Sequence, residues 1–179
     1  MIKRILEIEK LIEKGKVLMI YGPRQVGKTT LIKFFLTETN LKYRYDTGDS
    51  FEIADNLSSC TYKSTDEHVG NYELIVIDEA QKIENIGNAL KLMVDRHPDK
   101  YYIVTGSSSF DLANKTDESL TGRKNVYTLY PISQIELNLD ISKSELKSNV
   151  EDYLIYGSYP EVLSKQLSSD KEFVIKMIA

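Results

Sequence analysis

Apolar positions along the chain form two kinds of block, which together predict an α/β protein. Short runs rich in apolar and β-branched residues, typical of strands, alternate with longer stretches in which apolar residues recur at helical spacing. The run 74–77 is apolar at every position, which is typical of a strand buried on both faces of a parallel sheet. The predicted strands are residues 17–21, 41–46, 74–77, 101–105 and 126–129.

Helical spacing predicts most of the remaining elements. Over residues 1–14, Ile and Leu recur every three or four positions between charged residues, which predicts an amphipathic helix that ends at Gly15. Further helices are expected up to about residue 38, at residues 51–57 and around residues 89–94. Residues 58–70 are polar and show no period, so we expect a surface loop there.

The character of the chain changes after Pro131, where only helical patterns remain. Helices are predicted over residues 132–139, 149–156, 160–167 and 170–178. We therefore divide the chain into a core of residues 1–140 and the start of a helical lid at residues 141–179. The final stretch, residues 173–179, is mostly apolar, which indicates a missing continuation or a surface for a partner.

Residues 22–29 read GPRQVGKT and fit the phosphate-loop pattern G-x-x-x-x-G-K-[ST] without a mismatch. Backbone N–H groups of such a loop point at phosphate oxygens, and the helix that begins at Lys28 directs its positive end at the same anion. We expect Lys28 to reach the β- and γ-phosphates and the Thr29 hydroxyl to bind Mg²⁺. The predicted nucleotide-binding residues are Gly22, Pro23, Arg24, Gln25, Val26, Gly27, Lys28, Thr29 and Thr30.

Two adjacent carboxylates, Asp78 and Glu79, follow the apolar strand 74–77. In phosphate-loop enzymes the first acid at this position holds Mg²⁺, which predicts that role for Asp78. Successive side chains of a strand face opposite ways, so Glu79 can turn toward the γ-phosphate and polarise the attacking water. Gln81 lies close enough in sequence to help orient that water. An acidic pair that only caps the next helix is the weaker interpretation.

Two further positions are candidates for sensing or stabilising the γ-phosphate. Strand 101–105 runs into small polar residues, of which we favour Ser107, with Thr105 as the alternative. A serine-rich turn without any such contact explains the pattern almost as well. Arg123 precedes the last core strand and could stabilise charge on a transferring phosphoryl group, within the chain or across a subunit boundary. A solvated arginine in a glycine turn is nearly as good an interpretation.

The segment Asn114-Lys115-Thr116-Asp117 matches N-K-x-D, by which GTPases recognise guanine. A GTPase carries Asp-x-x-Gly after its Mg²⁺ strand, whereas Asp78 is followed here by Glu-Ala-Gln. Several residues also separate the segment from the preceding strand. We interpret the match as chance and expect ATP as the nucleotide.

Composition restricts the class of protein further. The 179 residues carry a net charge of −4, which argues against the basic surface of a nucleic-acid-binding domain. No apolar run is long enough to cross a membrane and no signal peptide is present, so we expect a cytoplasmic protein. One cysteine and two histidines exclude a disulfide within the chain and a multi-cysteine metal site, so Mg²⁺ with the nucleotide is the expected metal.

Several segments, taken together, resemble a known family. They are GPRQVGKTTLI, LIVIDEAQ, VTGSSSF, SLTGR, YPIS and YGSYPEVL, in this order. The chain is similar over residues 4–163 to the AAA-type P-loop ATPase domain of an archaeal and bacterial family. Members of that family join this domain to a C-terminal domain of unknown function. That domain does not follow Ala179, so we expect a truncated form or a short natural relative.

The resemblance implies a three-layer α/β/α fold with a five-stranded parallel sheet in the order 5-1-4-3-2. It implies a Walker A motif at residues 22–29 and a Walker B motif at Asp78 and Glu79. A sensor residue is implied near Ser107, and Arg123 stands where AAA proteins carry an arginine finger. The predicted function is Mg²⁺-dependent ATP hydrolysis that drives a conformational or partner-binding step. The alternative is a module whose bound ATP orders the C-terminal helices for a protein partner or a second copy.

Overall fold

The computed structural model describes residues 4–107, 119–165 and 168–178. By their internal contacts, the described residues fall into two compact units. The first, which we call the sheet unit, comprises Ile8–Gly22 and Lys28–Thr128. The second, which we call the helical unit, takes the described residues of Met1–Glu7, Pro23–Gly27 and Leu129–Ala179. The division at residues 140 and 141 is not tested by this grouping and stays a prediction.

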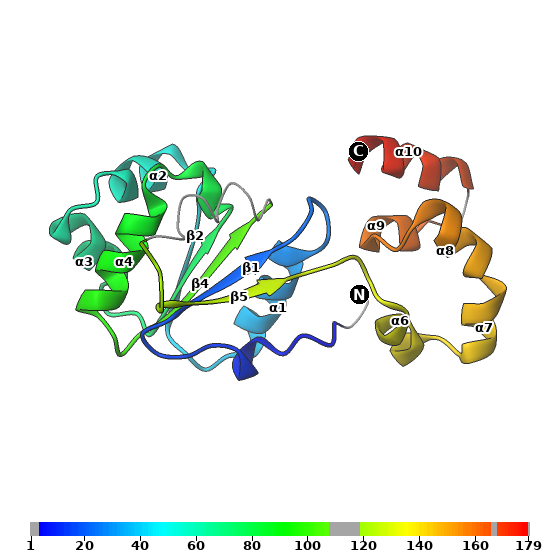
Figure 1. Ribbon diagram of the computed structural model, residues 1–179, viewed down its shortest axis with the longest axis horizontal. Coiled ribbons are helices and arrows are strands. Elements are labelled where there is room, and N and C mark those ends of the chain that lie inside the picture. The colour runs from blue at the N-terminus through cyan, green and yellow to red at the C-terminus, as the bar shows by residue number, and fades with distance from the viewer. Residues whose placement is uncertain (1–3, 108–118, 166–167, 179) are drawn as a thin grey trace. The chain divides into compact units, whose positions relative to one another are not determined.

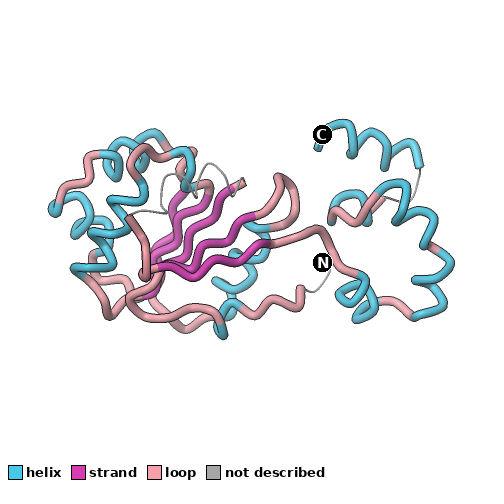
Figure 2. Tube along the Cα trace, in the orientation of Figure 1, coloured by secondary structure: helices cyan, strands magenta, loops and turns pink. Residues whose placement is uncertain are grey.

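Strands and helices alternate along the sheet unit (Figure 2). Its described elements are η1 (Ile8–Lys10), β1 (Val17–Tyr21), α1 (Lys28–Glu38), β2 (Tyr43–Thr47), α2 (Phe51–Ser58), α3 (Tyr62–Val69), β3 (Leu74–Asp78), η2 (Ala80–Lys82), α4 (Ile86–Arg96), β4 (Tyr101–Gly106) and β5 (Lys124–Thr128). Each strand lies within two residues of its predicted range.

All neighbouring strands of the sheet run parallel, in the order β2-β3-β4-β1-β5. This is the predicted order 5-1-4-3-2 read from the other edge, so the prediction is confirmed. Strands β1 and β3 are buried at every position, which explains why their sequences are continuous apolar runs rather than alternating ones.

Helices cover both faces of the sheet, which confirms the three-layer α/β/α fold. Because successive strand residues face opposite ways, alternate positions of β1, β3 and β4 form the core on each face. On one face these positions pack with α2, α3 and α4, and α1 lies on the other side of the sheet (Figure 1). The first core includes Met19, Ile75, Ile77, Leu57, Val69, Leu90, Met93 and Tyr102.

The helix predicted over residues 1–14 is wrong. Among its described residues only Ile8–Lys10 form a helical element, a short 3-10 turn. The backbone N–H of Ile5 donates to Glu136 Oε1 over 3.1 Å, and Arg4 Nη2 donates to the Tyr130 carbonyl over 2.6 Å. These distant partners take the backbone of the segment out of the helical conformation that its local pattern favours.

The loop predicted over residues 58–70 is also wrong, because α3 occupies Tyr62–Val69. Thr61 caps this helix: its hydroxyl accepts from the Ser64 backbone N–H, and the Ser64 hydroxyl accepts from the Thr61 backbone N–H. This reciprocal pair starts a helix even in a polar segment, since it satisfies two backbone donors at the helix start.

From Leu129 onward, every regular element in the described part of the helical unit is a helix. They are α6 (Gln134–Asp140), α7 (Lys143–Ser148), α8 (Val150–Tyr156), α9 (Pro160–Leu163) and α10 (Ser168–Ile178). The sequence predicts four of these, whereas α7 was not anticipated and α9 ends earlier than residue 167. No helix in the described ranges is long and apolar enough to cross a membrane.

Candidate functional site

The carboxyl ends of β1, β3 and β4 lie at one edge of the sheet, because the strands are parallel and in register. Tyr21, the last residue of β1, pairs with Gly106 of β4, and Ile77 of β3 pairs with Val104. Ligands of open α/β sheets bind outside this edge. The edge therefore collects the residues that follow these strands, which include most of the predicted site.

Lys28 and Thr29 open α1 directly after the phosphate-loop residues. Lys28 is 5% exposed, and its Nζ donates to the Gly22 carbonyl over 2.8 Å. The Thr29 hydroxyl donates to Asp78 Oδ2 over 2.7 Å. The two residues predicted to bind Mg²⁺ are thus in direct contact, although 48 residues separate them in the sequence.

The remaining phosphate-loop residues, Pro23–Gly27, group with the helical unit. Gln25 and Gly27 both have positive φ angles, of 60° and 97°, which produce the tight curl of the loop. A Cβ added at Gly27 would lie 3.8 Å from Cγ of Pro160, the first residue of α9. Contact of Pro23–Gly27 and Thr30 with a nucleotide stays a prediction.

Asp78 is 4% exposed, and its carboxylate accepts four hydrogen bonds from the protein. Its Oδ2 accepts from the hydroxyls of Thr29 and of Tyr45, the latter over 2.9 Å. Its Oδ1 accepts from the Thr105 hydroxyl and from the Glu79 backbone N–H, the latter over 3.2 Å. Because two oxygens offer about four acceptor positions, this carboxylate is held in one orientation.

The backbone at Glu79 has a left-handed conformation, with a φ of 50°. Its backbone N–H also donates to Thr105 Oγ1 over 3.1 Å, and its carbonyl lies against Gly48 on the loop after β2. A Cβ at Gly48 would stand 2.5 Å from that carbonyl oxygen, so only glycine fits there. Neighbouring strands therefore hold Glu79 in a conformation that costs energy for a non-glycine residue, as functional sites often do.

Gln81 connects two predicted site residues. Its Nε2 donates to Glu79 Oε2 over 2.5 Å and to Ser107 Oγ over 3.0 Å. The structure therefore brings Glu79 and Ser107 together through one amide group. Thr105, the alternative to Ser107, instead contacts Asp78 and the Glu79 backbone.

Arg123 lies apart from these residues, at the amino ends of the strands rather than at their carboxyl ends. Its carbonyl accepts from the Val17 backbone N–H at the beginning of β1, and β1 spans roughly 13 Å from that point to the phosphate loop. The Arg123 guanidinium binds Asp95 of α4 through two hydrogen bonds of 2.6 and 3.3 Å. Within one chain, Arg123 is not assembled with Lys28, Asp78 and Glu79.

Tyr45 is the residue at this site that sequence reasoning missed. It belongs to the edge strand β2, where an aromatic residue in an alternating pattern indicates only a strand position. Burial, followed by the nearby Asp78 charge, raises the pKa of its phenol, so Tyr45 remains a hydrogen-bond donor at neutral pH. No spacing in the sequence relates it to Asp78.

The described residues contain no group of three or more His, Cys, Asp or Glu side chains that could hold a metal ion. Metal binding at this edge would therefore depend on hydroxyl and carboxylate oxygens, water and the phosphates of a nucleotide. The N-K-x-D segment, residues 114–117, lies outside the described residues, so its interpretation as chance stays a prediction.

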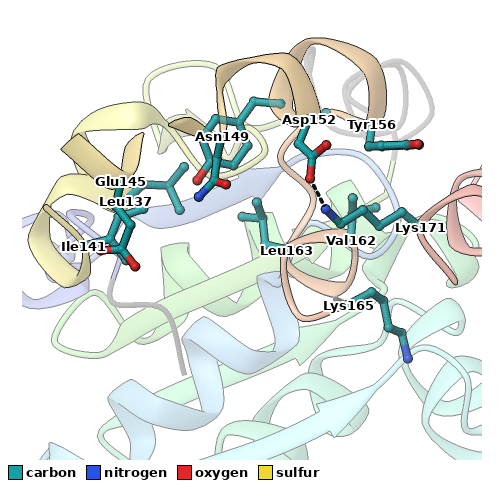
Figure 3. A pocket seen from close by; sticks show the side chains of 12 residues that line it. Leu137, Ile141, Glu145, Asn149, Asp152, Tyr156, Val162, Leu163, Lys165 and Lys171 are labelled. Carbon is teal, nitrogen blue, oxygen red and sulfur yellow. Dashed lines mark hydrogen bonds and ion pairs between the residues drawn. The ribbon is translucent and has the colours of Figure 1, made fainter. Parts of the chain in front are cut away.

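The helical unit contains a cavity of about 440 Å³ (Figure 3). The Asp152 carboxylate of α8 and the Lys171 ammonium group of α10 form an ion pair at its wall. Other lining residues include Leu137, Ile141, Glu145, Asn149, Val162, Leu163 and Lys165. None of the predicted nucleotide, metal or catalytic residues lines it, so this cavity is separate from the candidate site.

Comparison with known proteins gives a family and a fold. The model of a family described as an AAA domain matches residues 14–138. None of the curated proteins compared with the chain matches it.

Two archaeal proteins of known structure share the fold. A Walker-type ATPase of Pyrococcus abyssi superposes with a TM-score of 0.52 at 16% identity, over 90% of this chain and 66% of its own. A signal transduction ATPase with numerous domains from Pyrococcus horikoshii, which carries a tetratricopeptide repeat sensor, gives 0.53 at 18% identity. That match covers 92% of this chain but 30% of the other. The chain thus spans less than two thirds of either protein.

Proposed function

The chain belongs to the AAA domain family, and on this premise we propose that it is a Mg²⁺-dependent ATPase whose site lies at the carboxyl ends of β1, β3 and β4. The observation that carries the proposal is the 2.7 Å hydrogen bond between Thr29 of the phosphate-loop motif and Asp78. These are the two side chains that phosphate-loop enzymes bring together around nucleotide phosphates and metal.

The oxygen donors at this edge fit Mg²⁺, which prefers carboxylate, hydroxyl, water and phosphate oxygens. The Thr29 hydroxyl would hold the ion. Asp78 would hold the ion through water, or directly in exchange for one of the four hydrogen bonds that already use its acceptor positions. When bound, Mg²⁺ neutralises negative charge on the β- and γ-phosphate oxygens of the nucleotide.

The other residues of the edge bind phosphate and handle the proton of water. The Lys28 ammonium group and the loop amides, Gly22–Thr30, bind the triphosphate. The Glu79 carboxylate accepts a proton from the water that attacks the γ-phosphorus in line with the leaving oxygen. The Gln81 amide orients Glu79. Ser107, which accepts from the same amide, senses the γ-phosphate. Catalysis comes mainly from positioning and charge stabilisation.

Nucleotide binding and phosphate release, measured separately with ATP and with GTP in the presence of Mg²⁺, test this function. We expect the wild type to bind and hydrolyse ATP, and Lys28→Ala to lose binding. Glu79→Gln should keep ATP binding while phosphate release falls by roughly 10²- to 10⁴-fold. Lys91→Ala, which removes an exposed lysine of α4, serves as the matched control and should behave as the wild type.

Each result separates one part of the proposal from the others. A wild type that binds no nucleotide would overturn the function as a whole. Normal hydrolysis by Glu79→Gln would remove this residue from the mechanism while leaving the ATPase in place. A clear preference for GTP over ATP would overturn the interpretation of residues 114–117 as a chance match, and equal use of both would overturn the expected preference for ATP.

The second candidate is a module that binds ATP but turns it over slowly, and one observation favours it. Large apolar side chains of the helical unit are exposed, among them Leu154 at 81%, Phe173 at 65% and Ile155 at 61%. Such a surface suits a second copy or another protein partner, which bound ATP would recruit by ordering these helices. Tight ATP binding with negligible phosphate release would select this function over the first.

A further inference from the structure

The phenol of Tyr45 and the hydroxyl of Thr29 both donate a hydrogen bond to the same oxygen, Oδ2 of Asp78. Tyr45 Oη donates to Asp78 Oδ2 over 2.9 Å, and Thr29 Oγ1 donates to the same oxygen over 2.7 Å. We propose that Tyr45 is a positioning residue for Mg²⁺, which keeps the Asp78 carboxylate turned toward Thr29. The inference rests on the proposed function, because it concerns the metal of that site.

The sheet directs Tyr45 at Asp78. Tyr45 of β2 pairs with Val76 of β3, and paired residues of neighbouring strands project from the same face. Asp78 is two residues beyond Val76, so it projects from that face as well. The long phenol side chain bridges from one strand to the end of the next. The Nζ atom of Lys33 on α1 lies 5.9 Å from the centre of the Tyr45 ring, which places this ring on the side of the sheet that α1 covers.

The hydrogen bond between Tyr45 and Asp78 has a fixed donor and a fixed acceptor. The Tyr45 phenol carries the donated hydrogen and the Asp78 carboxylate offers only acceptor positions, so Tyr45 donates and the carboxylate accepts. Thr105 and the Glu79 backbone bind the other oxygen, Oδ1, and Thr29 is the only other donor from the described residues to Oδ2. Without the phenol, Thr29 would be the one remaining donor from the described residues to Oδ2, and this side of the carboxylate would be held less firmly toward Thr29.

Hydrogen-bond partners of metal-binding carboxylates influence metal affinity strongly, and their loss costs roughly tenfold or more. Tyr45→Phe removes one hydroxyl and keeps the ring, so the packing against α1 and β3 is preserved. We therefore expect this substitution to weaken Mg²⁺ binding by about tenfold. Affinity for the nucleotide without metal should stay within twofold of the wild type, because Tyr45 is not among the phosphate-loop residues.

A fluorescent ATP analogue, titrated first in EDTA and then with increasing Mg²⁺, measures both quantities on the full chain. The matched control is Tyr43→Phe, which removes a phenol hydroxyl from an exposed position of the same strand. The expected result is a tenfold rise in the Mg²⁺ concentration of half-saturation for Tyr45→Phe alone. Thermal unfolding without ligand should give the same Tm for both variants within a few degrees.

An unchanged Mg²⁺ midpoint for Tyr45→Phe, with a wild type that responds to Mg²⁺, would overturn the inference and leave the proposed function intact. An equal loss of nucleotide affinity with and without Mg²⁺ would also overturn it, because that pattern indicates a structural role. A wild type whose nucleotide binding ignores Mg²⁺ would overturn the metal-dependent function and the inference with it.

Discussion

The side-chain amide of Gln81 donates to Glu79 Oε2 over 2.5 Å while the same nitrogen lies 3.0 Å from Ser107 Oγ. One amide group thereby connects the candidate base to the residue proposed to register the γ-phosphate. If the Ser107 hydroxyl moved toward the γ-phosphate, its hydrogen bond with Gln81 would change, and with it the orientation of Glu79. If the proposed function holds, this relationship would make hydrolysis depend on the presence of the γ-phosphate.

We predict that Gln81→Ala lowers kcat by roughly ten- to a hundredfold with little change in nucleotide affinity, because a misplaced base slows the reaction without weakening binding. Gln81→Glu should be at least as slow, since it places a second negative charge beside Glu79. Steady-state phosphate release, analysed for kcat and KM separately, checks both variants. The control is Gln134→Ala, at an exposed position of α6. A loss that appears equally in nucleotide affinity would contradict the positioning role.

Arg123 lies at the amino ends of the strands, away from Lys28, Asp78 and Glu79 of its own chain, so we expect any contribution to hydrolysis to come across a subunit boundary. We predict that Arg123→Ala and Lys28→Ala are each inactive, with losses of roughly a thousandfold or more for a missing arginine finger. A mixture of the two should regain part of the wild-type phosphate release, since an intact Arg123 then meets an intact phosphate loop. Wild-type turnover per molecule should rise with protein concentration.

The control for this mixing experiment is Asp95→Ala, which removes the carboxylate partner of Arg123 and leaves the arginine in place. It should remain active, because the finger needs the arginine and not its resting partner. If the mixture shows no recovery and turnover per molecule does not depend on concentration, Arg123 stabilises α4 through Asp95 and has no part in hydrolysis.

Most of the sheet and the centre of the site could be predicted from the sequence, because both depend on local pattern. Continuous apolar runs identify β1 and β3 as buried strands, and parallel strands bring the residues that follow them to one edge. Lys28, Thr29, Asp78 and Glu79 meet there for this reason. The position of Arg123 could also be predicted from the sequence, since a residue that precedes a parallel strand lies at the amino ends of the strands.

Contacts between distant segments account for the features that the sequence did not predict. Glu136 accepts from the Ile5 backbone across 131 residues, which prevents a helix that the local pattern favours. Tyr45 reaches Asp78 from the neighbouring strand, and no periodicity relates those two positions. Helices α3 and α7 differ from these cases, because each begins at a local cap in a polar segment: Thr61 with Ser64 for α3, and Ser142, whose hydroxyl accepts from the Glu145 backbone N–H, for α7.

Gly48→Ala should slow hydrolysis more than it weakens nucleotide binding. A Cβ at this position would stand 2.5 Å from the Glu79 carbonyl oxygen and 3.3 Å from Ile83 Cγ1, so the Glu79 backbone must move. Such a steric clash typically costs roughly 1–3 kcal/mol in the free energy of unfolding. Chemical denaturation and phosphate release measure the two effects. Ser50→Ala, in the same loop and without a side-chain cap bond, is the control and should change neither.

His68 should make the protein less stable in mild acid. Its side chain is buried on α3, its Nε2 lies 3.6 Å from Asp46 Oδ2, and Arg44 binds the same Asp46 oxygen over 2.5 Å. Burial first, and the Arg44 charge second, lower the pKa of His68 from 6.5 to about 4, against the opposing effect of Asp46. Folded His68 therefore stays neutral between pH 6.5 and 4, where the unfolded chain takes up a proton.

Because the unfolded state binds more protons in this window, the free energy of unfolding should fall as the pH drops from 6.5 to 4, by up to about 3 kcal/mol from this group. Below pH 4 His68 contributes no further loss. Urea denaturation at pH 7 and at pH 4.5 measures the difference, which His68→Gln should reduce because glutamine does not titrate. His97→Gln, the matched control, removes the other histidine, which is partly exposed beside Asp66, and should leave the His68 contribution in place. Equal acid sensitivity in the wild type and in His68→Gln would show that other groups cause it.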